Sequence, residues 1–225
     1  MLFRSIVVLV DDDNVLAPDY LERTLEIARL HRNLGTWSGQ IDLSLEDPSR
    51  PPPPELRHLL CERAFRSPIW SNDPNHLAAT PWGAGMCIRR EVVHAYGASV
   101  KANSRRLMLD LQGETLAYGG DTGIAYTGCS IWVGMGVFPR LRLTHLIPQG
   151  RTGLDYLLGS LEGHAYSEVL HAWILHGRVP QPRSDVREVL GMWARWICSS
   201  SLERRMMGAR QRGFHRARRE INRIG

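Results

Sequence analysis

The chain has 225 residues, of which 43% are hydrophobic and 23% charged, an ordinary composition for a globular α/β domain with an appendage. Its four cysteines are scattered without a C-x-x-C pair, which argues against a zinc site or a disulfide framework and predicts a reducing, cytoplasmic environment. No signal peptide is apparent, and no apolar run reaches the roughly 18 residues that a membrane span needs. The net charge of +5 comes mainly from arginines near the C-terminus.

The segment Ser5–Tyr20, SIVVLVDDDNVLAPDY, predicts a buried strand, a cluster of carboxylates and the start of a helix. The apolar, β-branched run Ile6–Val10 is typical of a strand covered on both faces in a parallel or mixed sheet. Alternation along the strand places Asp11 and Asp13 on one side, where two carboxylates suit a hard divalent cation that also holds a diphosphate. The alternative is a solvated acidic turn that caps the next helix through Asp13 or Asn14.

The pattern after this segment predicts alternating strands and helices. A helix is expected after Pro18, because Leu21, Leu25 and Ala28 recur at helical spacing. The long irregular stretch Arg66–Pro81 is expected to be functional or disordered. The remaining elements are expected to be a strand at Leu34–Ile41, a helix at Glu55–Phe65, a strand at Met86–Ile88, a helix at Arg90–Tyr96 closed by Gly97, and strands at Ser130–Phe138 and Leu141–Ile147.

Three more segments carry candidate functional residues. In PWGAGMCIRREV, Gly83 and Gly85 permit a backbone turn, and taken alone this segment is better explained by a core aromatic at Trp82 with glycines that only make a turn. In YGGDTGIAYTG, Asp121 is expected at a helix N-terminus, where an anion is favoured, and an N-cap role alone would also account for it. His145 lies in the alternating segment LRLTHLI, and a single histidine on a strand is more often structural than a ligand.

The chain from Leu154 onward is expected to be helical. An apolar stripe extends from Leu154 to Val169, and a second amphipathic helix is predicted at Ser184–Ile197. The last segment, Ser199–Gly225, is strongly basic and poor in large apolar residues. From Arg178 to the end, twelve arginines stand against four acidic residues.

Together and in this order, these segments resemble the family 2 glycosyltransferases of the GT-A fold. VVLVDDDNVLAPDYL resembles the family's strand, DxD motif and helix, and PWGAGMCIRREV resembles its acceptor-side loop. GGDTGIAY stands where the family carries an acidic pair with the catalytic base, and LTHLIPQGRT resembles its His-containing segment. The resemblance covers about Phe3–Gly163. It implies a Rossmann-like α/β fold, a mixed sheet flanked by helices, with residues 1–153 as the C-terminal part of a GT-A catalytic domain and 154–225 as a basic helical extension.

The resemblance implies a role for each matching residue. Asp11 and Asp13 are expected to bind a Mn²⁺ or Mg²⁺ ion that bridges the diphosphate of a nucleotide sugar, with His145 completing the metal site. Arg151 is expected to bind a phosphate, and Asp121 to deprotonate the acceptor hydroxyl in an inverting displacement. The loop expected to bind the acceptor consists of Trp82, Gly83, Ala84 and Gly85.

The implied partners are a nucleotide-sugar donor and a saccharide or lipid-linked acceptor. Peripheral docking on an anionic membrane, at its cytoplasmic face, is expected from Trp193 and Trp196 followed by a row of arginines. The alternative is that both tryptophans pack on the core and the arginines form a solvated end. No nucleic-acid partner is expected, because aromatic residues are not interleaved with the arginines.

Two departures from the family pattern leave other functions open. Gly120 replaces the first acid of the family's pair, and the chain begins almost at the DxD strand, without the segment that grips the nucleotide base and ribose. The sequence is therefore expected to be a fragment, a mis-started reading frame or a remnant, and a catalytically inactive binding protein is an alternative. A phosphatase of the haloacid dehalogenase class is another, with Asp11 and Asp13 in its first motif and Lys101 downstream, although Asp121 lacks the acidic partner that this class needs.

Overall fold

The structure is a computed structural model that describes residues 5–103, 105, 119–177, 179, 196 and 198–224. These residues divide into two compact units. The first unit contains those before residue 108 together with Gly120–Gly153, and the second contains Gly119 and those from Leu154 onward. The predicted helix Ser184–Ile197 lies outside the described residues except for Trp196.

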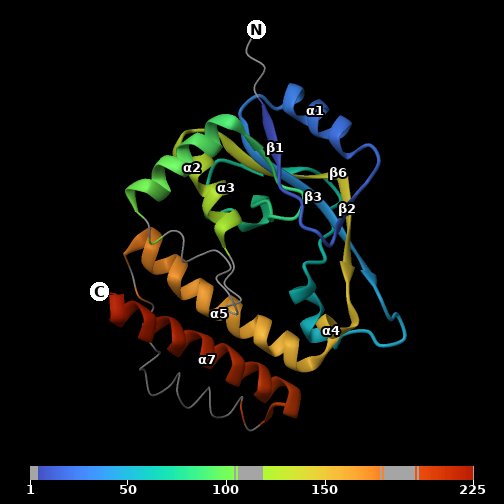
Figure 1. Cartoon of the computed structure of the whole chain (residues 1–225), viewed down its shortest axis with the longest axis vertical. Coiled ribbons are helices and arrows are strands. Elements are labelled where there is room, and N and C mark those ends of the chain that lie inside the picture. Colours follow the sequence, from blue (N-terminus) through green and yellow to red (C-terminus); the bar gives the residue numbers. More distant parts are fainter. Residues whose placement is uncertain are drawn as a thin grey trace. The chain divides into compact units, whose positions relative to one another are not determined.

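The first unit is built on a six-stranded sheet with the order β1-β5-β3-β6-β2, in which β4 also pairs with β6 (Figure 1). The strands are β1 (Ile6–Val8), β2 (Asn14–Leu16), β3 (Leu34–Leu45), β4 (Ile69–Ser71), β5 (Cys87–Arg89) and β6 (Gly134–Ile147). β3 and β6 are parallel, and the other pairs are antiparallel. The expected fold class, a mixed α/β sheet of the GT-A kind flanked by helices, is confirmed.

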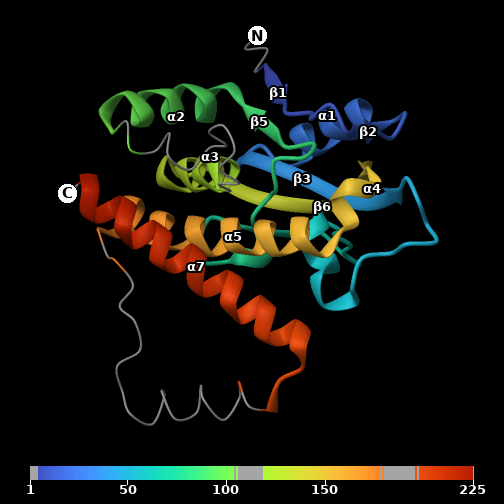
Figure 2. The same cartoon turned by 60° about the horizontal axis from the view of Figure 1, so that its bottom comes forward.

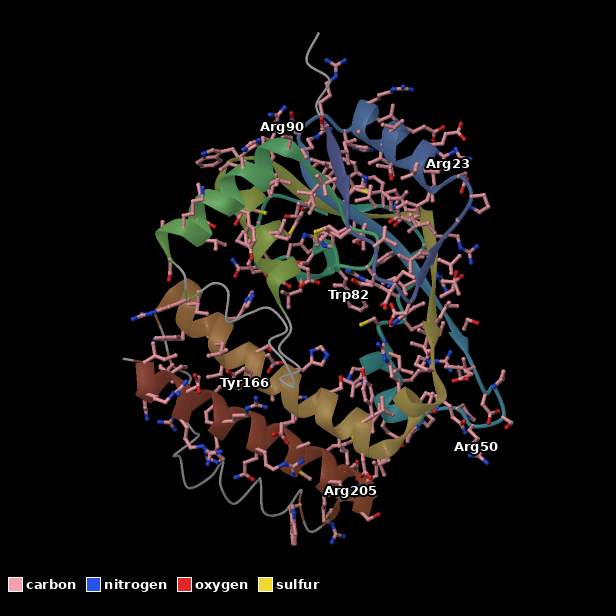
Figure 3. The ribbon with its side chains drawn as sticks, viewed as in Figure 1. Arg23, Arg50, Trp82, Arg90, Tyr166 and Arg205 are labelled. Carbon is pink, nitrogen blue, oxygen red and sulfur yellow. The ribbon has the colours of Figure 1, made fainter. Side chains whose placement is uncertain are left out.

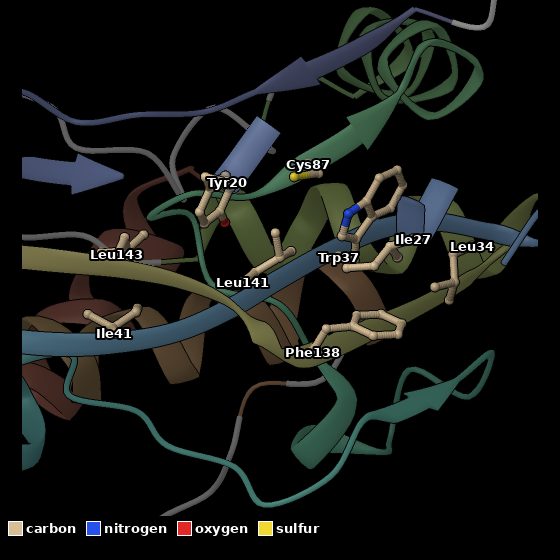
Figure 4. Close-up of a cluster of buried hydrophobic side chains, with 9 residues drawn as sticks. All are labelled: Tyr20, Ile27, Leu34, Trp37, Ile41, Cys87, Phe138, Leu141 and Leu143. Atoms are coloured by element: carbon tan, nitrogen blue, oxygen red, sulfur yellow. The ribbon is translucent and has the colours of Figure 1, made fainter. Parts of the chain in front are cut away.

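Helices cover both faces of this sheet (Figure 2). The helices of this unit are α1 (Tyr20–Leu30), α2 (Arg90–Ala102), α3 (Gly120–Ser130), the single turn α4 (Gln149–Thr152), and the 3₁₀ helices η1 (Pro54–Leu60) and η2 (Leu77–Ala79). Alternate residues of β5 point to opposite faces. Cys87 therefore lies in the core cluster beneath α1 (Figure 4), whereas Ile88 packs with Val92 of α2 and Ile124 of α3.

Strand β1 is shorter and more exposed than its sequence predicts. It ends at Val8 rather than Val10, and Val7 is 41% exposed. β1 occupies one end of the strand order and pairs with β5. The prediction of a strand covered on both faces is therefore wrong, because the face of β1 that carries Val7 is open to solvent.

Helix α1 leaves two of the leucines that predicted it exposed. Its buried residues are Tyr20, Thr24 and Ile27, whereas Leu21 is 60% and Leu25 is 49% exposed. Two polar contacts accompany this orientation: the Tyr20 hydroxyl donates to the carbonyl oxygen of Gly85 at 2.7 Å, and the Thr24 hydroxyl lies 3.3 Å from the sulfur of Cys87. The helix predicted after Pro18 is confirmed, and these contacts with β5 and its preceding loop determine which side of it is buried.

Other boundaries also differ from prediction, and β3 continues four residues beyond the predicted Ile41 to Leu45. α2 continues through Gly97 to Ala102, and the segment predicted as a helix at Glu55–Phe65 forms the 3₁₀ helix η1. The two strands predicted from Ser130 to Ile147 are one strand, β6, whose register against β3 shifts opposite Gly39. A β-carbon at Gly39 would overlap the backbone of β6, so this shift in the sheet needs a glycine.

The second unit consists of the helices α5 (Leu154–His176) and α7 (Ser201–Ile224), which pack on each other. The predicted apolar stripe of α5 is largely buried, including Leu157, Leu161 and Val169. α7 buries its small residues, and a β-carbon at Gly213 would overlap the carbonyl of Glu162, so the helices approach closely there. In the part of the chain that the structure describes, no helix is long and apolar enough to cross a membrane.

Candidate functional site

The first two acidic residues of the candidate site lie in the turn between β1 and β2. The backbone N–H of Asn14 donates to the carbonyl oxygen of Asp11 at 3.1 Å, which closes the turn. β2 then pairs with β6 in a register that places Asn14 opposite His145. The N–H of Leu146 donates to the carbonyl oxygen of Asp13 at 2.8 Å, so strand pairing itself brings Asp13 beside His145. Asn14 therefore belongs to β2, and the alternative in which this turn caps α1 is wrong: α1 begins after Asp19.

The carboxylate of Asp13 is held by three side chains. Arg151 on α4 donates from Nη1 to Oδ2 of Asp13 at 2.5 Å, and Nε2 of His145 lies 3.3 Å from the same oxygen. Nδ2 of Asn14 donates to Oδ1 of Asp13 at 2.7 Å. Two residues that the resemblance implicates in metal and phosphate binding, His145 and Arg151, thus both contact Asp13, the third.

The ring of His145 faces an acceptor on each side. Its Nδ1 lies 3.1 Å from the carbonyl oxygen of Leu60, and its Nε2 faces Asp13. The tautomer decides whether Nδ1 donates to Leu60 or Nε2 donates to Asp13, and a ring that donates to Leu60 turns the lone pair of Nε2 toward Asp13, where a cation would be bound. A histidine that ligates a metal commonly donates its other N–H to a backbone carbonyl in this way.

Asp11 is surrounded by more negative than positive side chains. Its side chain is exposed, yet the surrounding protein removes enough water to raise its pKa, and the charges of Asp13, Asp12 and Asp121 raise it further. His145 acts in the opposite direction. An added cation would relieve this repulsion. Among the described residues, no group of three or more His, Cys, Asp or Glu side chains forms a complete metal site.

Asp121 lies in the first turn of α3 and contacts the predicted acceptor loop. Its Oδ1 accepts a hydrogen bond from the N–H of Thr122 at 2.7 Å, and its Oδ2 accepts one from the N–H of Gly83 at 2.8 Å. The expected position of Asp121 at a helix N-terminus is confirmed. The hydrogen bond to Gly83 goes beyond capping, because it fixes the candidate base against another segment of the chain.

The acceptor loop itself is held against the turn that carries Asp11. The N–H of Gly85 donates to the carbonyl oxygen of Leu9, and the N–H of Leu9 donates to that of Met86, both at 2.9 Å. Gly85 has a φ of +71°, and a β-carbon there would lie 2.5 Å from the hydroxyl of Tyr20. Trp82 is half-buried and packs against the core cluster under α1, as does Ala84, so the alternative of a core aromatic is partly right.

Cys61, which the sequence analysis did not single out, lies among the candidate site residues. Burial raises the pKa of its thiol to about 11, and the charges of Asp121, Asp11 and Asp13 raise it as well, whereas Arg151 lowers it. Four predicted site residues from three segments therefore act on one thiol. A single cysteine after a 3₁₀ helix carries no local pattern that could have identified it.

Arg63 is a second residue that the sequence analysis missed. Its half-buried guanidinium lies over the ring of Trp82, with Cζ 4.3 Å from the ring centroid. Burial lowers the pKa of Arg63 to about 10, and the charge of Asp121 opposes that shift. Only the irregular stretch that begins at Arg66 hinted that this region is functional.

Comparison with known proteins gives one family. The family model described as "Glycosyltransferase like family 2" matches residues 1–124, which is more than half of the chain. The match includes Asp11, Asp13, the loop at Trp82 and Asp121, and it ends before His145 and Arg151. A comparison with curated proteins found no match.

Proposed function

Because the chain belongs to the glycosyltransferase-like family 2, we propose that it transfers a sugar from a nucleotide-sugar donor to an acceptor hydroxyl, with inversion at the anomeric carbon. The observation that carries this proposal is geometric: His145 and Arg151 both contact the carboxylate of Asp13, and one loop donates from Gly83 to Asp121 and from Gly85 to Leu9, next to the acidic turn. A donor site needs acids and a phosphate ligand close to the base, and this is such a set. Membership of this family also argues against the alternative of a haloacid dehalogenase phosphatase.

The residues at Asp13 fit a Mn²⁺ or Mg²⁺ ion whose coordination is completed by substrate. Such ions prefer oxygen ligands and are commonly bound by one or two carboxylates together with substrate phosphates. Asp11 and Asp13 supply the carboxylates in this proposal, and Nε2 of His145 is directed at the same oxygen of Asp13. The bound ion supplies Lewis-acid stabilisation of the departing diphosphate.

Arg151 changes partner in this proposal. In the structure its guanidinium pairs with Asp13 through a short hydrogen bond. A diphosphate offers the same guanidinium a bidentate partner of higher charge, so donor binding transfers Arg151 from the carboxylate to a phosphate. The exchange leaves Asp13 free to bind the ion when the donor arrives.

Asp121 acts as the general base. The N–H groups of Gly83 and Thr122 hold its two oxygens in place and leave a remaining lone pair to accept a proton. In the displacement, the acceptor oxygen bonds to the anomeric carbon, the bond to the diphosphate breaks, and the acceptor's proton passes to Asp121. The acceptor binds along the loop Trp82–Gly85, next to this carboxylate.

The acceptor class in this proposal is a saccharide or a lipid-linked saccharide, and the basic α7 serves peripheral docking on an anionic membrane. Trp196 is 46% exposed, and Cζ of Arg204 lies 5.2 Å from the centroid of its ring. An exposed tryptophan beside an arginine suits the headgroup region of a bilayer. Trp193, the second tryptophan of this prediction, lies outside the described residues.

A panel of nucleotide sugars tests the proposed reaction. The protein is incubated with UDP- and GDP-sugars and simple saccharide acceptors, with Mn²⁺ or with EDTA, and products are identified by mass spectrometry. We expect transfer only with Mn²⁺, and a loss of at least about 100-fold in Asp121→Asn, the usual contribution of a general base. Asp42→Asn is the control, because Asp42 pairs with Arg142 on the exposed sheet surface. No transfer from any donor would favour the inactive alternative, and full activity in Asp121→Asn would exclude Asp121 as the base.

A further inference from the structure

Arg63 joins the core sheet to the acceptor loop through polar and aromatic contacts at once. Its backbone exchanges two hydrogen bonds with Ile41 of β3, at 2.9 and 3.0 Å. Its side chain donates from Nη1 to the carbonyl oxygen of Thr80 at 2.7 Å and from Nη2 to that of Ala78 at 3.1 Å. Arg63 is therefore anchored to the sheet by its backbone and to the segment before Trp82 by its guanidinium.

The same guanidinium lies between two aromatic rings. Its Cζ is 4.3 Å from the ring centroid of Trp82 and 4.8 Å from that of Phe65. Cation–π contacts at these distances are favourable and restrict the orientation of each ring. Figure 3 labels Trp82 within the first unit. Because Trp82 directly precedes Gly83, fixing this ring also fixes the N–H that Gly83 donates to Asp121.

We propose that Arg63 is the positioning residue of the acceptor site, holding the Trp82 ring and, through Gly83, the carboxylate of Asp121. This role rests on the proposed transfer reaction, in which Asp121 is the base. The negative charge of Asp121 also acts on the guanidinium and opposes the lowering of the Arg63 pKa by burial. A planar fork is required: a lysine keeps the charge, but it cannot donate to two carbonyls while it stacks between two rings.

The first test needs no activity. The protein is labelled with 5-fluorotryptophan and ¹⁵N, and the resonances of Trp82 and of the Gly83 amide are assigned with Trp82→Phe and by standard triple-resonance methods. In Arg63→Met we expect the Trp82 fluorine resonance to shift and the Gly83 amide proton to move upfield, because its hydrogen bond to Asp121 lengthens. Arg57→Met is the matched control, since Arg57 pairs with Glu62 at the surface of the same segment.

Arg63→Lys keeps the test decisive if Arg63→Met fails to fold. We expect the lysine variant to fold and to show intermediate shifts at Trp82 and Gly83. Unchanged resonances in either folded variant would overturn the proposal, whether or not the protein transfers sugar.

Kinetics then separate positioning from a general structural role. In Arg63→Lys we expect kcat/KM for the acceptor to fall about tenfold or more, since small displacements of a catalytic group cost that much. Affinity for the nucleoside diphosphate should stay within about twofold, because Arg63 lies on the acceptor side. Equal losses for donor and acceptor would contradict the proposal. If the resonances respond but no variant, including the native protein, transfers sugar, the transfer reaction is wrong and the positioning role stands.

Discussion

The reactivity of the Cys61 thiol can report the effect of each charged side chain of the candidate site separately. This thiol is partly exposed at the end of η1, and its pKa is raised to about 11. Only the thiolate reacts with alkylating reagents, so the reaction rate at fixed pH follows the pKa of this thiol. Each neighbouring negative charge should therefore lower that rate, and each positive charge should raise it.

Asp121→Asn should speed alkylation of Cys61, and Arg151→Gln should slow it. Removing a carboxylate lowers the thiol pKa and increases the thiolate fraction, whereas removing the guanidinium does the reverse. A change of one pKa unit alters the rate about tenfold under these conditions. The rate is measured at about pH 8.5, near the ordinary thiol pKa, with iodoacetamide and peptide mass spectrometry.

Two controls accompany this measurement. Cys198 is exposed and should react at the same rate in all variants. Asp42→Asn should leave Cys61 unchanged, because Asp42 is not among the charges that act on it. Rates for Cys61 that do not differ between Asp121→Asn and Arg151→Gln would show that these side chains do not surround one site.

Two glycines that look alike in sequence have opposite structural roles in their elements. Gly97 lies inside α2 and is exposed, and a β-carbon added there would meet nothing within 4 Å. Gly85 precedes β5 with a φ of +71°, and Tyr20 and Leu143 fill the space that a β-carbon would take. The first is a weak point in a helix, and the second is a steric requirement of the acceptor loop.

Gly97→Ala should raise the free energy of unfolding by about 0.5–1 kcal/mol, because alanine loses less backbone entropy in a helix. Gly85→Ala should lower it by at least about 2 kcal/mol, since a left-handed backbone and a crowded site both oppose the new β-carbon. Urea denaturation of both variants measures the two changes. A stabilising Gly85→Ala would mean that the loop is not held as the structure shows.

Local patterns predicted the elements that carry the site but not their contacts. The apolar run before Asp11 and the glycines before Asp121 identified a strand with an acidic turn and a helix N-terminus, and both exist. The register between β2 and β6 that joins Asp13 to His145 was not predictable in detail, because it depends on pairing between strands far apart in the chain.

Sequence patterns failed where contacts between residues far apart in the chain determine how a helix or side chain is oriented. The rotation of α1 depends on Gly85 and Cys87, which lie far along the chain, so its leucine spacing predicted the helix but could not show which side is buried. The contacts of Arg63 with Ala78, Thr80 and Trp82 link residues in irregular segments, where no periodic signal exists.

At the scale of the whole molecule, the membrane proposal depends on charges that are already partly matched. On α7, Arg205 pairs with Asp155 at 2.8 Å and Arg212 pairs with Glu162 at 2.7 Å. Exposed pairs of this kind contribute little to stability, so the arginines can turn to lipid phosphates at small cost. Figure 3 labels Arg205 on α7 and Arg50 in the loop after β3.

The protein should sediment with vesicles that contain phosphatidylserine at low salt and should be released as salt rises, because screening shortens the reach of surface charge. Arg204→Glu combined with Arg219→Glu on α7 should weaken sedimentation. Arg32→Glu combined with Arg50→Glu, two exposed sites in the first unit, is the control of equal charge. Sedimentation that is absent at low salt, or that both variants weaken equally, would show that α7 is not a docking surface.

The central claim is that Asp13 takes part in a metal-dependent site for a nucleotide diphosphate, and calorimetry tests it most directly. UDP and GDP are titrated into the protein and into Asp13→Asn, each with Mn²⁺ or with EDTA, with Asp42→Asn as the control. We predict that at least one nucleotide binds about tenfold or more tightly with Mn²⁺ than with EDTA, and that Asp13→Asn alone removes the difference. Binding that is absent with Mn²⁺, equal with EDTA, or unchanged in Asp13→Asn would contradict the account.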